Sequence, residues 1–181
     1  MAFMALTATI YNFDIDLSDS DRGVYETVAL RVAQHPSESD EYLMARVLAY
    51  LLEHAEGIVF SRGVSEPEEP MISVRDLTGK ITSWIEIGTP DSARLHKASK
   101  AADRVAVYCH KEHSQWLKGL GAAGIHRADA LELYAIDRTL IAELVSRLDR
   151  RMAFGVSINE RELYVSIGDA NLTGRVERIT F

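Results

Sequence analysis

The stretch KITSWIEIGTPD, residues 80–91, decides how the rest of the chain is interpreted. Its first eight residues are rich in β-branched and aromatic side chains, which predicts a strand. The Thr-Pro-Asp that ends the stretch supplies an N-cap, a proline for the first helical position and an acid for the first turn, so a helix is expected over residues 90–103. Within the strand, Glu86 lies between two isoleucines, where a carboxylate needs solvent or a partner.

Two shorter strand-like runs, residues 58–64 and 71–75, precede this strand. The sequence Asp76-Leu-Thr-Gly between the second run and the strand is a turn signal, because Asp favours the opening of a turn and Gly favours its close. The three runs therefore predict an antiparallel three-stranded meander. Counting back across the turn places Glu69 opposite Glu86.

A long helix precedes the meander. Apolar pairs recur every four residues between Leu43 and Leu52, which is the strongest helical pattern in the chain. Ser37 is the expected N-cap, and the helix is expected to end near Gly57. Residues 105–110 predict a further strand after the second helix. The central part of the chain is thus predicted to be α/β, in the order helix, three-stranded antiparallel meander, helix, strand.

Further elements are predicted on both sides of this core. An alternating run over residues 6–16 predicts an N-terminal strand, and the cap-like sequence Asp19-Ser-Asp predicts a helix through residues 25–34. Downstream we expect a polar helix, a strand, a helix capped by Asp137 and a C-terminal run of strands, at residues 112–118, 131–136, 137–148 and 153–181. Because no repeat or linker interrupts the pattern, residues 1–181 are expected to form a single domain.

Composition excludes several classes of function. Hydrophobic residues make up 47% and charged residues 26% of the chain, and the formal net charge is −7, so the surface as a whole does not attract polyanions. The single cysteine, Cys109, excludes an intramolecular disulfide framework and a thiol cluster for zinc, and we expect it to be a buried strand residue. The chain shows neither a secretory signal nor a membrane span, so a cytoplasmic protein without a membrane partner is expected.

Carboxylates are the main candidates for chemistry, because the chain has no Gly-rich phosphate loop, Gly-x-Ser-x-Gly elbow or His-Glu-x-x-His sequence. Glu86 and Glu69 would repel each other across the meander, and a hard cation such as Mg²⁺ or Mn²⁺ is the usual remedy. The alternative is that Glu69 belongs to a solvated acidic loop. Glu41 and Glu38 begin the long helix, where the alternative is a favourable interaction with the helix dipole.

The cationic counterpart is the segment 91–120, in which six Lys and Arg residues against three acids give a local net charge of +3. Arg94, Lys97, Lys100 and Arg104 fall on one face at helical spacing. We call these four residues the basic stripe. It is either a solvated helix face or a contact for the phosphates of a nucleic-acid partner.

Several short sequences stand out together: His-Pro-Ser-Glu at 35–38, Arg-Gly at 62–63, Glu-Pro at 69–70, Trp-Ile-Glu-Ile-Gly-x-Pro-Asp at 84–91 and Lys-Ala at 97–98. In these sequences and their order the chain resembles the YaeQ family of small bacterial proteins, and the match covers nearly the whole chain. The resemblance implies a variant of the PD-(D/E)xK nuclease-like fold, whose core has the same order of helix, meander, helix and strand. The N-terminal strand and helix and the C-terminal strands are additions to that core.

The resemblance also implies roles for the acidic residues. In such nucleases an acid on the second strand and an acid on the third strand bind the metal. Glu86 corresponds to the third-strand acid, and Glu69 or Asp76 corresponds to the second. We expect Glu69, since Asp76 serves the turn. A glutamate on the first helix corresponds to Glu41, or alternatively to Glu38.

One element of the family pattern is missing. Such nucleases carry a lysine two residues after the third-strand acid, and Gly88 stands at that position here. The resemblance therefore implies a cation from the following helix, for which we expect Lys97, with Arg94 as the nearer alternative.

Two functions follow from these residues. The first is a metal-dependent phosphodiesterase that uses Mg²⁺ or Mn²⁺ on nucleic acid, with Arg94, Lys100 and Arg104 contacting phosphates. The alternative is a non-catalytic binding or regulatory protein on a degenerate nuclease scaffold. A bound divalent ion distinguishes the two.

Overall fold

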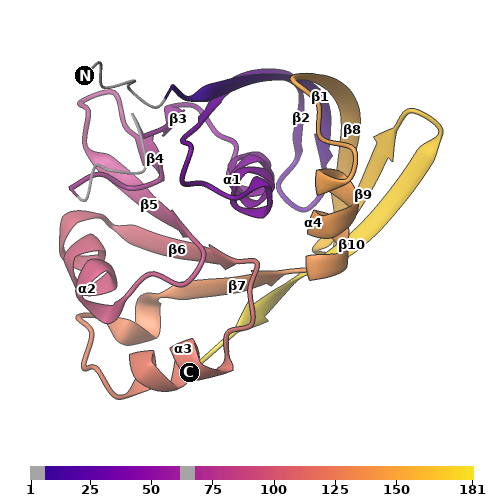
Figure 1. Ribbon diagram of the computed structural model, residues 1–181. Helices are drawn as coiled ribbons and strands as arrows, with labels where there is room; N and C mark the ends of the chain where they lie inside the picture. The colour runs from indigo at the N-terminus through magenta and orange to yellow at the C-terminus, as the bar shows by residue number, and fades with distance from the viewer. Residues whose placement is uncertain (1–6, 62–67) are drawn as a thin grey trace, which may run out of the picture.

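A ten-stranded sheet runs through the molecule in the order β2-β1-β8-β9-β10-β7-β6-β5-β4-β3 (Figure 1). The computed structural model describes residues 7–61 and 68–181. Neighbouring strands are antiparallel, except that β1 with β8, β5 with β6 and β6 with β7 are parallel. The strands are β1 (Thr9–Asp19), β2 (Val24–Gln34), β3 (Ile58–Phe60), β4 (Ile72–Arg75), β5 (Ile81–Ile87), β6 (Arg104–Cys109), β7 (Glu132–Ile136), β8 (Arg151–Asn159), β9 (Glu162–Ile167) and β10 (Ala170–Ile179).

Helices cover the two halves of the sheet differently (Figure 1). α1 (Asp40–Leu52) lies beneath the arch of β1, β2 and β8 and packs against α4 (Arg138–Val145), β5 and β6. α2 (Ser92–Ala101) and α3 (Ser114–Gly121) contribute to a second hydrophobic cluster on the other face of β5–β7. Strands β1, β2 and β8 alternate buried and exposed residues, as expected for a sheet with one solvated face. Within the described residues, no helix is long and apolar enough to cross a membrane.

The predicted order of the central elements is confirmed. α1, the antiparallel meander β3–β5, α2 and β6 follow one another over residues 40–109, and the expected extension of the first meander strand from 62 to 64 lies outside the described residues. The helix caps differ slightly from the prediction. Ser39 rather than Ser37 caps α1, and Asp91 itself caps α2, because each of these side chains accepts a hydrogen bond from a backbone N–H in the first turn.

The predicted helix over residues 25–34 is wrong, since this segment is β2, the edge strand that pairs with β1. Its apolar residues fit a spacing of three and four as well as a strict alternation, and pairing with β1 selects the alternation by burying one face against α1. The cap-like Asp19 belongs to a hairpin turn instead. Its carboxylate accepts hydrogen bonds from the backbone N–H groups of Asp21 and Arg22.

The register of the meander differs from the expected one by two residues. The ladder pairs Ile72 with Ile85. One residue of the shift comes from the turn, which centres on Thr78 because Asp76 faces Lys80, and the other comes from a β-bulge in the pairing of β4 with β5. Glu86 therefore lies beside Met71 instead of directly opposite Glu69. A count of residues across a turn cannot anticipate a bulge, because the bulge adds a residue to one strand only.

Gly174→Ala is expected to lower the free energy of unfolding by about 2 kcal/mol, because a Cβ at this position of β10 would lie 2.6 Å from the Cβ of Leu140 in α4. Gly155→Ala is the matched control, since it also lies within a strand and its Cβ would meet no heavy atom closer than 3.9 Å. Urea unfolding of both variants measures the difference. Equal losses would contradict the close packing of α4 on β10.

Candidate functional site

Glu86 is a buried carboxylate near the end of β5, with 2% of its surface exposed. The indole Nε1 of Trp84, two residues earlier on the same face of the strand, donates a hydrogen bond of 2.6 Å to Glu86 Oε1. A guanidinium nitrogen of Arg94 lies 2.8 Å from the same oxygen. The backbone N–H of Met71 also donates to this carboxylate. The chain itself thus supplies Glu86 with three partners.

Arg94 comes from the first turn of α2, which begins at the N-cap Asp91. Besides Glu86, its guanidinium donates a hydrogen bond of 2.7 Å to the backbone carbonyl oxygen of Glu69 and lies 5.9 Å from the centre of the Trp84 ring. Arg94 therefore connects β5, α2 and the segment before β4. The cation that faces Glu86 is this guanidinium, while its expected contact with phosphate stays a prediction.

Burial changes the acid–base properties of this region. It raises the pKa of the Glu86 carboxyl group above its ordinary value, although Arg94 and Trp84 act in the opposite direction. Burial and the negative charge of Glu86 also raise the pKa of Tyr42, in the first turn of α1, to about 12. The Tyr42 hydroxyl is therefore protonated at neutral pH and remains a hydrogen-bond donor.

Several residues expected at this site have other surroundings. Lys97 forms an ion pair with Glu68 on the surface, where both side chains are substantially exposed. Glu38 forms an ion pair of 2.8 Å with Arg46 of α1, and both side chains are 5% exposed. Glu41 lies exposed in the first turn of α1. The structure thus pairs Lys97 and Glu38 with side chains other than Glu86.

Asp76 serves the turn between β4 and β5, as expected. Its Oδ1 accepts hydrogen bonds from the backbone N–H groups of Thr78 and Lys80, at 2.9 and 3.0 Å, and from the Thr78 hydroxyl. These hydrogen bonds lower the pKa of Asp76.

Glu69, the other candidate for the second-strand acid, is half-buried and contacts Arg94 through its backbone. Cys109 is fully buried on β6, which confirms that prediction.

The surroundings of Glu86 do not fit a divalent cation in this arrangement. Mg²⁺ and Mn²⁺ prefer several oxygen ligands, with carboxylates at their centre. Within residues 7–61 and 68–181, no group of three or more His, Cys, Asp or Glu side chains is placed to hold a metal ion. One oxygen of the Glu86 carboxylate, Oε1, is already bound by Arg94 and Trp84. A metal ion that used this oxygen would require Arg94 to move away.

His110, directly after β6, is a residue of this region to which the sequence assigned no role. It is 6% exposed, and neither ring nitrogen has a hydrogen-bond partner in the described parts of the chain. The Tyr42 ring packs edge-on against it with 6.0 Å between centroids, and a Cβ at Gly88 would lie 3.9 Å from atoms of both rings. Burial and the charge of Lys111 lower the pKa of His110 to about 4, so the ring is neutral at pH 7.

A cavity of about 420 Å³ lies beside Tyr42 at the N-terminus of α1. It is lined by Ser37, Glu38, Ser39, Tyr42 and Lys111. Since the Glu38 carboxylate pairs with Arg46, the exposed Lys111 is the cation in this lining, and no ion pair within the described residues involves it. The cavity therefore offers hydroxyl groups and one ammonium group to a ligand.

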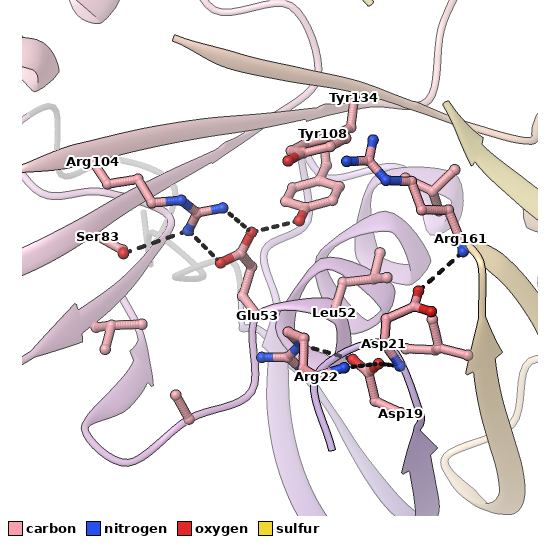
Figure 2. Close-up of a pocket in the computed structure, with 14 residues that line it drawn as sticks. Asp19, Asp21, Arg22, Leu52, Glu53, Ser83, Arg104, Tyr108, Tyr134 and Arg161 are labelled. Carbon is pink, nitrogen blue, oxygen red and sulfur yellow. Dashed lines mark hydrogen bonds and ion pairs between the residues drawn. The ribbon is translucent and has the colours of Figure 1, made fainter. Parts of the chain in front are cut away.

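The last two residues of the basic stripe lie in different surroundings. The Arg104 guanidinium forms an ion pair of 2.6 Å with Glu53 at the end of α1 (Figure 2). It forms a second ion pair, of 2.5 Å, with Glu132 on β7. The Tyr108 hydroxyl donates to the same Glu53. Lys100 is exposed on α2. Carboxylates thus neutralise three of the four cations of the basic stripe. These pairings depend on residues distant in sequence, which local spacing does not indicate.

Comparisons with known proteins agree on one family. The model of the family described as YaeQ protein matches residues 4–176. "Uncharacterized protein YaeQ" of Salmonella typhi is 33% identical over 171 residues, covering 93% of this chain and 94% of the relative, and that of Escherichia coli K12 is 32% identical with the same coverage. Crystal structures of YaeQ proteins from Pseudomonas syringae and Xanthomonas axonopodis pv. citri each superpose with a TM-score of 0.88, at 28% and 32% identity. Each match covers 96% of this chain, and it covers 97% of the Pseudomonas syringae chain and 99% of the Xanthomonas axonopodis pv. citri chain.

Arg94→Met is expected to lower the free energy of unfolding at pH 7 by about 3 kcal/mol, because it leaves the Glu86 carboxylate buried without its cation. The loss should shrink at pH 4, where Glu86 becomes protonated. Lys97→Met is the control, since it removes the same charge from an exposed ion pair and should cost less than about 1 kcal/mol. Urea unfolding at both pH values measures these differences. Similar losses for both variants at pH 7 would contradict the importance of the buried pair.

His110 should contribute to the pH dependence of stability. Its pKa in the folded state is about 4, below the ordinary value of 6.5, so the unfolded state binds more protons between these values and stability rises with pH across this window. His110→Phe is expected to remove this rise. Unfolding measured from pH 4 to pH 7, together with an NMR titration of the ring, tests the prediction, and an imidazole that titrates near 6.5 would contradict it.

Proposed function

The chain belongs to the YaeQ family, and we propose that it is a non-catalytic binding or regulatory protein built on a degenerate nuclease-like scaffold. In this proposal the order of α1, the meander β3–β5, α2 and β6 is that of a PD-(D/E)xK nuclease-like core. The acidic site of such a core is retained in Glu86. An ion pair within the chain takes the place of the metal.

The observation that supports this proposal is the ion pair between Glu86 and Arg94. The carboxylate is 3% exposed and the guanidinium 21% exposed as side chains, so the pair lies mostly out of water. Separating it would leave a buried charge without a partner, which costs about 3–5 kcal/mol. A divalent cation would have to supply at least that much before it could bind at Glu86.

The competing proposal, a metal-dependent phosphodiesterase, makes two demands on this site. Glu86 would have to release Arg94, and a second acid would have to turn toward Glu86. Of the two cations expected to replace the lysine that is missing at Gly88, Lys97 pairs with Glu68, whereas the alternative, Arg94, does face Glu86. The non-catalytic proposal needs no rearrangement of these side chains.

The basic stripe offers little support for a nucleic-acid partner. Binding to a phosphate backbone depends on several cations that are free to replace counterions. Arg94, Lys97 and Arg104 are each neutralised by carboxylates, which leaves Lys100. The cavity beside Tyr42, with Lys111 in its lining, offers a ligand one cation that no carboxylate of the described residues neutralises.

The test compares the wild-type protein with Glu86→Gln. Titration calorimetry with Mn²⁺ is expected to show no binding up to about 1 mM for either protein, because Arg94 already holds the carboxylate. With Mg²⁺ or Mn²⁺ present, neither protein should hydrolyse bis(p-nitrophenyl) phosphate or labelled DNA and RNA oligonucleotides faster than the other. A known PD-(D/E)xK nuclease serves as the positive control for both assays.

Two outcomes would overturn the proposal. Mn²⁺-dependent hydrolysis by the wild type that is lost in Glu86→Gln would establish the phosphodiesterase instead. Mn²⁺ binding that is lost in Glu86→Gln, without hydrolysis, would show that the metal site survives and that Arg94 does not replace the cation.

A further inference from the structure

A second cavity of about 420 Å³ lies at the other end of α1, where the two halves of the sheet meet (Figure 2). Tyr42 and Glu53 are eleven residues apart on this helix, which corresponds to roughly 16 Å along its axis, so the cavity is separate from the Glu86 site. Its walls come from α1, the β1–β2 and β8–β9 turns, and strands of both halves. A cavity of this size is within the range of small-molecule sites.

Most charged groups in the wall of this cavity already have partners. Arg104 is held by Glu53 and Glu132, and the Tyr108 hydroxyl donates to Glu53. Arg22 pairs with Asp19 at 2.7 Å and donates to two backbone carbonyl oxygens at the C-terminal end of α1. These charged groups neutralise one another within the chain and stabilise the fold, so none of them needs a ligand as a partner.

Arg161 differs from the other arginines of the cavity. Figure 2 shows its side chain directed from the β8–β9 turn toward Tyr108 and Tyr134. Its guanidinium carbon lies 5.2 Å from the centre of the Tyr134 ring. Across residues 7–61 and 68–181, no hydrogen bond or ion pair involves this guanidinium, so its N–H groups remain available to a ligand.

The backbone that presents Arg161 is strained. Glu160 and Arg161 form the two-residue turn between β8 and β9, with φ values of 50° and 62°, a conformation that favours glycine or asparagine. The carboxylate of Asp21, from the β1–β2 turn, accepts hydrogen bonds from both backbone N–H groups at 2.7 and 3.0 Å. A second hairpin thus holds the turn in place. Strain that the surrounding structure enforces is typical of functional positions.

We propose that this cavity is a binding site for a small organic oxyanion, a carboxylate or a phosphate ester with an apolar body, and that Arg161 anchors the anionic group. The Arg161 guanidinium lies over the Tyr134 ring, and its planar fork can donate two parallel hydrogen bonds to a carboxylate or a phosphate. Leu52, Ile158 and Val176 supply apolar wall for the body of the ligand. The site does not depend on the function proposed for Glu86.

Three probes test the site by NMR titration of the ¹⁵N-labelled protein: phenyl phosphate, benzoate and inorganic phosphate. Phenyl phosphate or benzoate is expected to bind with a Kd below about 10 mM, and inorganic phosphate at least about tenfold more weakly because it has no apolar body. The tighter of the two aromatic probes identifies the anionic group. Shifted amide signals should include Arg161 and Tyr134.

Variants separate binding from folding. Arg161→Gly is expected to raise the midpoint of thermal unfolding, because glycine relieves the positive φ. It should also weaken binding of the tighter aromatic probe by about tenfold or more. Arg161→Gln should weaken this binding similarly without the gain in stability. Arg151→Gln removes an exposed arginine from the solvated face of β8 and should leave binding unchanged. The proposal fails if no aromatic probe binds below about 10 mM, or if either Arg161 variant binds as the wild type does.

Discussion

Burial of α1 is the constraint on which the rest of the structure depends. Seven consecutive residues, Leu43 to Ala49, are buried, so the helix is enclosed by the sheet arch, by β5 and β6 and by α4. A helix enclosed in this way has no water for its polar side chains. Arg46 therefore pairs with Glu38 and donates to a carbonyl oxygen of β2, while Glu53 pairs with Arg104. Both cavities that we consider functional lie at the ends of this helix, where the enclosure stops.

The same constraint explains why acids in the core do not gather into a metal site. Glu38, Glu53 and Glu86 are each buried or nearly so, and each faces an arginine of the same chain. A metal centre needs the opposite arrangement, in which several carboxylates share one cation. A nuclease-like order of elements can thus persist while the charges inside it are rearranged into separate pairs. The fold alone then says little about catalysis.

Prediction from sequence succeeded where the signal was local. The meander, the turn built on Asp76 and the capping of α4 by Asp137 each follow from residues within a few positions of one another. It failed where the outcome depended on distant residues. Strand β2 carries apolar spacing that suits a helix, and only its pairing with β1 decides the matter. The residue opposite Glu86 was also predicted wrongly, because the observed register places Met71 there instead of Glu69, whereas Arg94, the alternative to Lys97, is the cation that faces Glu86.

Arg94 occupies the cation position at Glu86, and a crystal of the protein soaked in Mn²⁺ tests this most directly. An anomalous difference map reports the ion without any assumption about activity. We predict no Mn²⁺ peak at Glu86, with the Arg94 guanidinium still about 2.8 Å from the carboxylate. A peak within about 2.2 Å of a Glu86 oxygen, with Arg94 displaced, would contradict the claim.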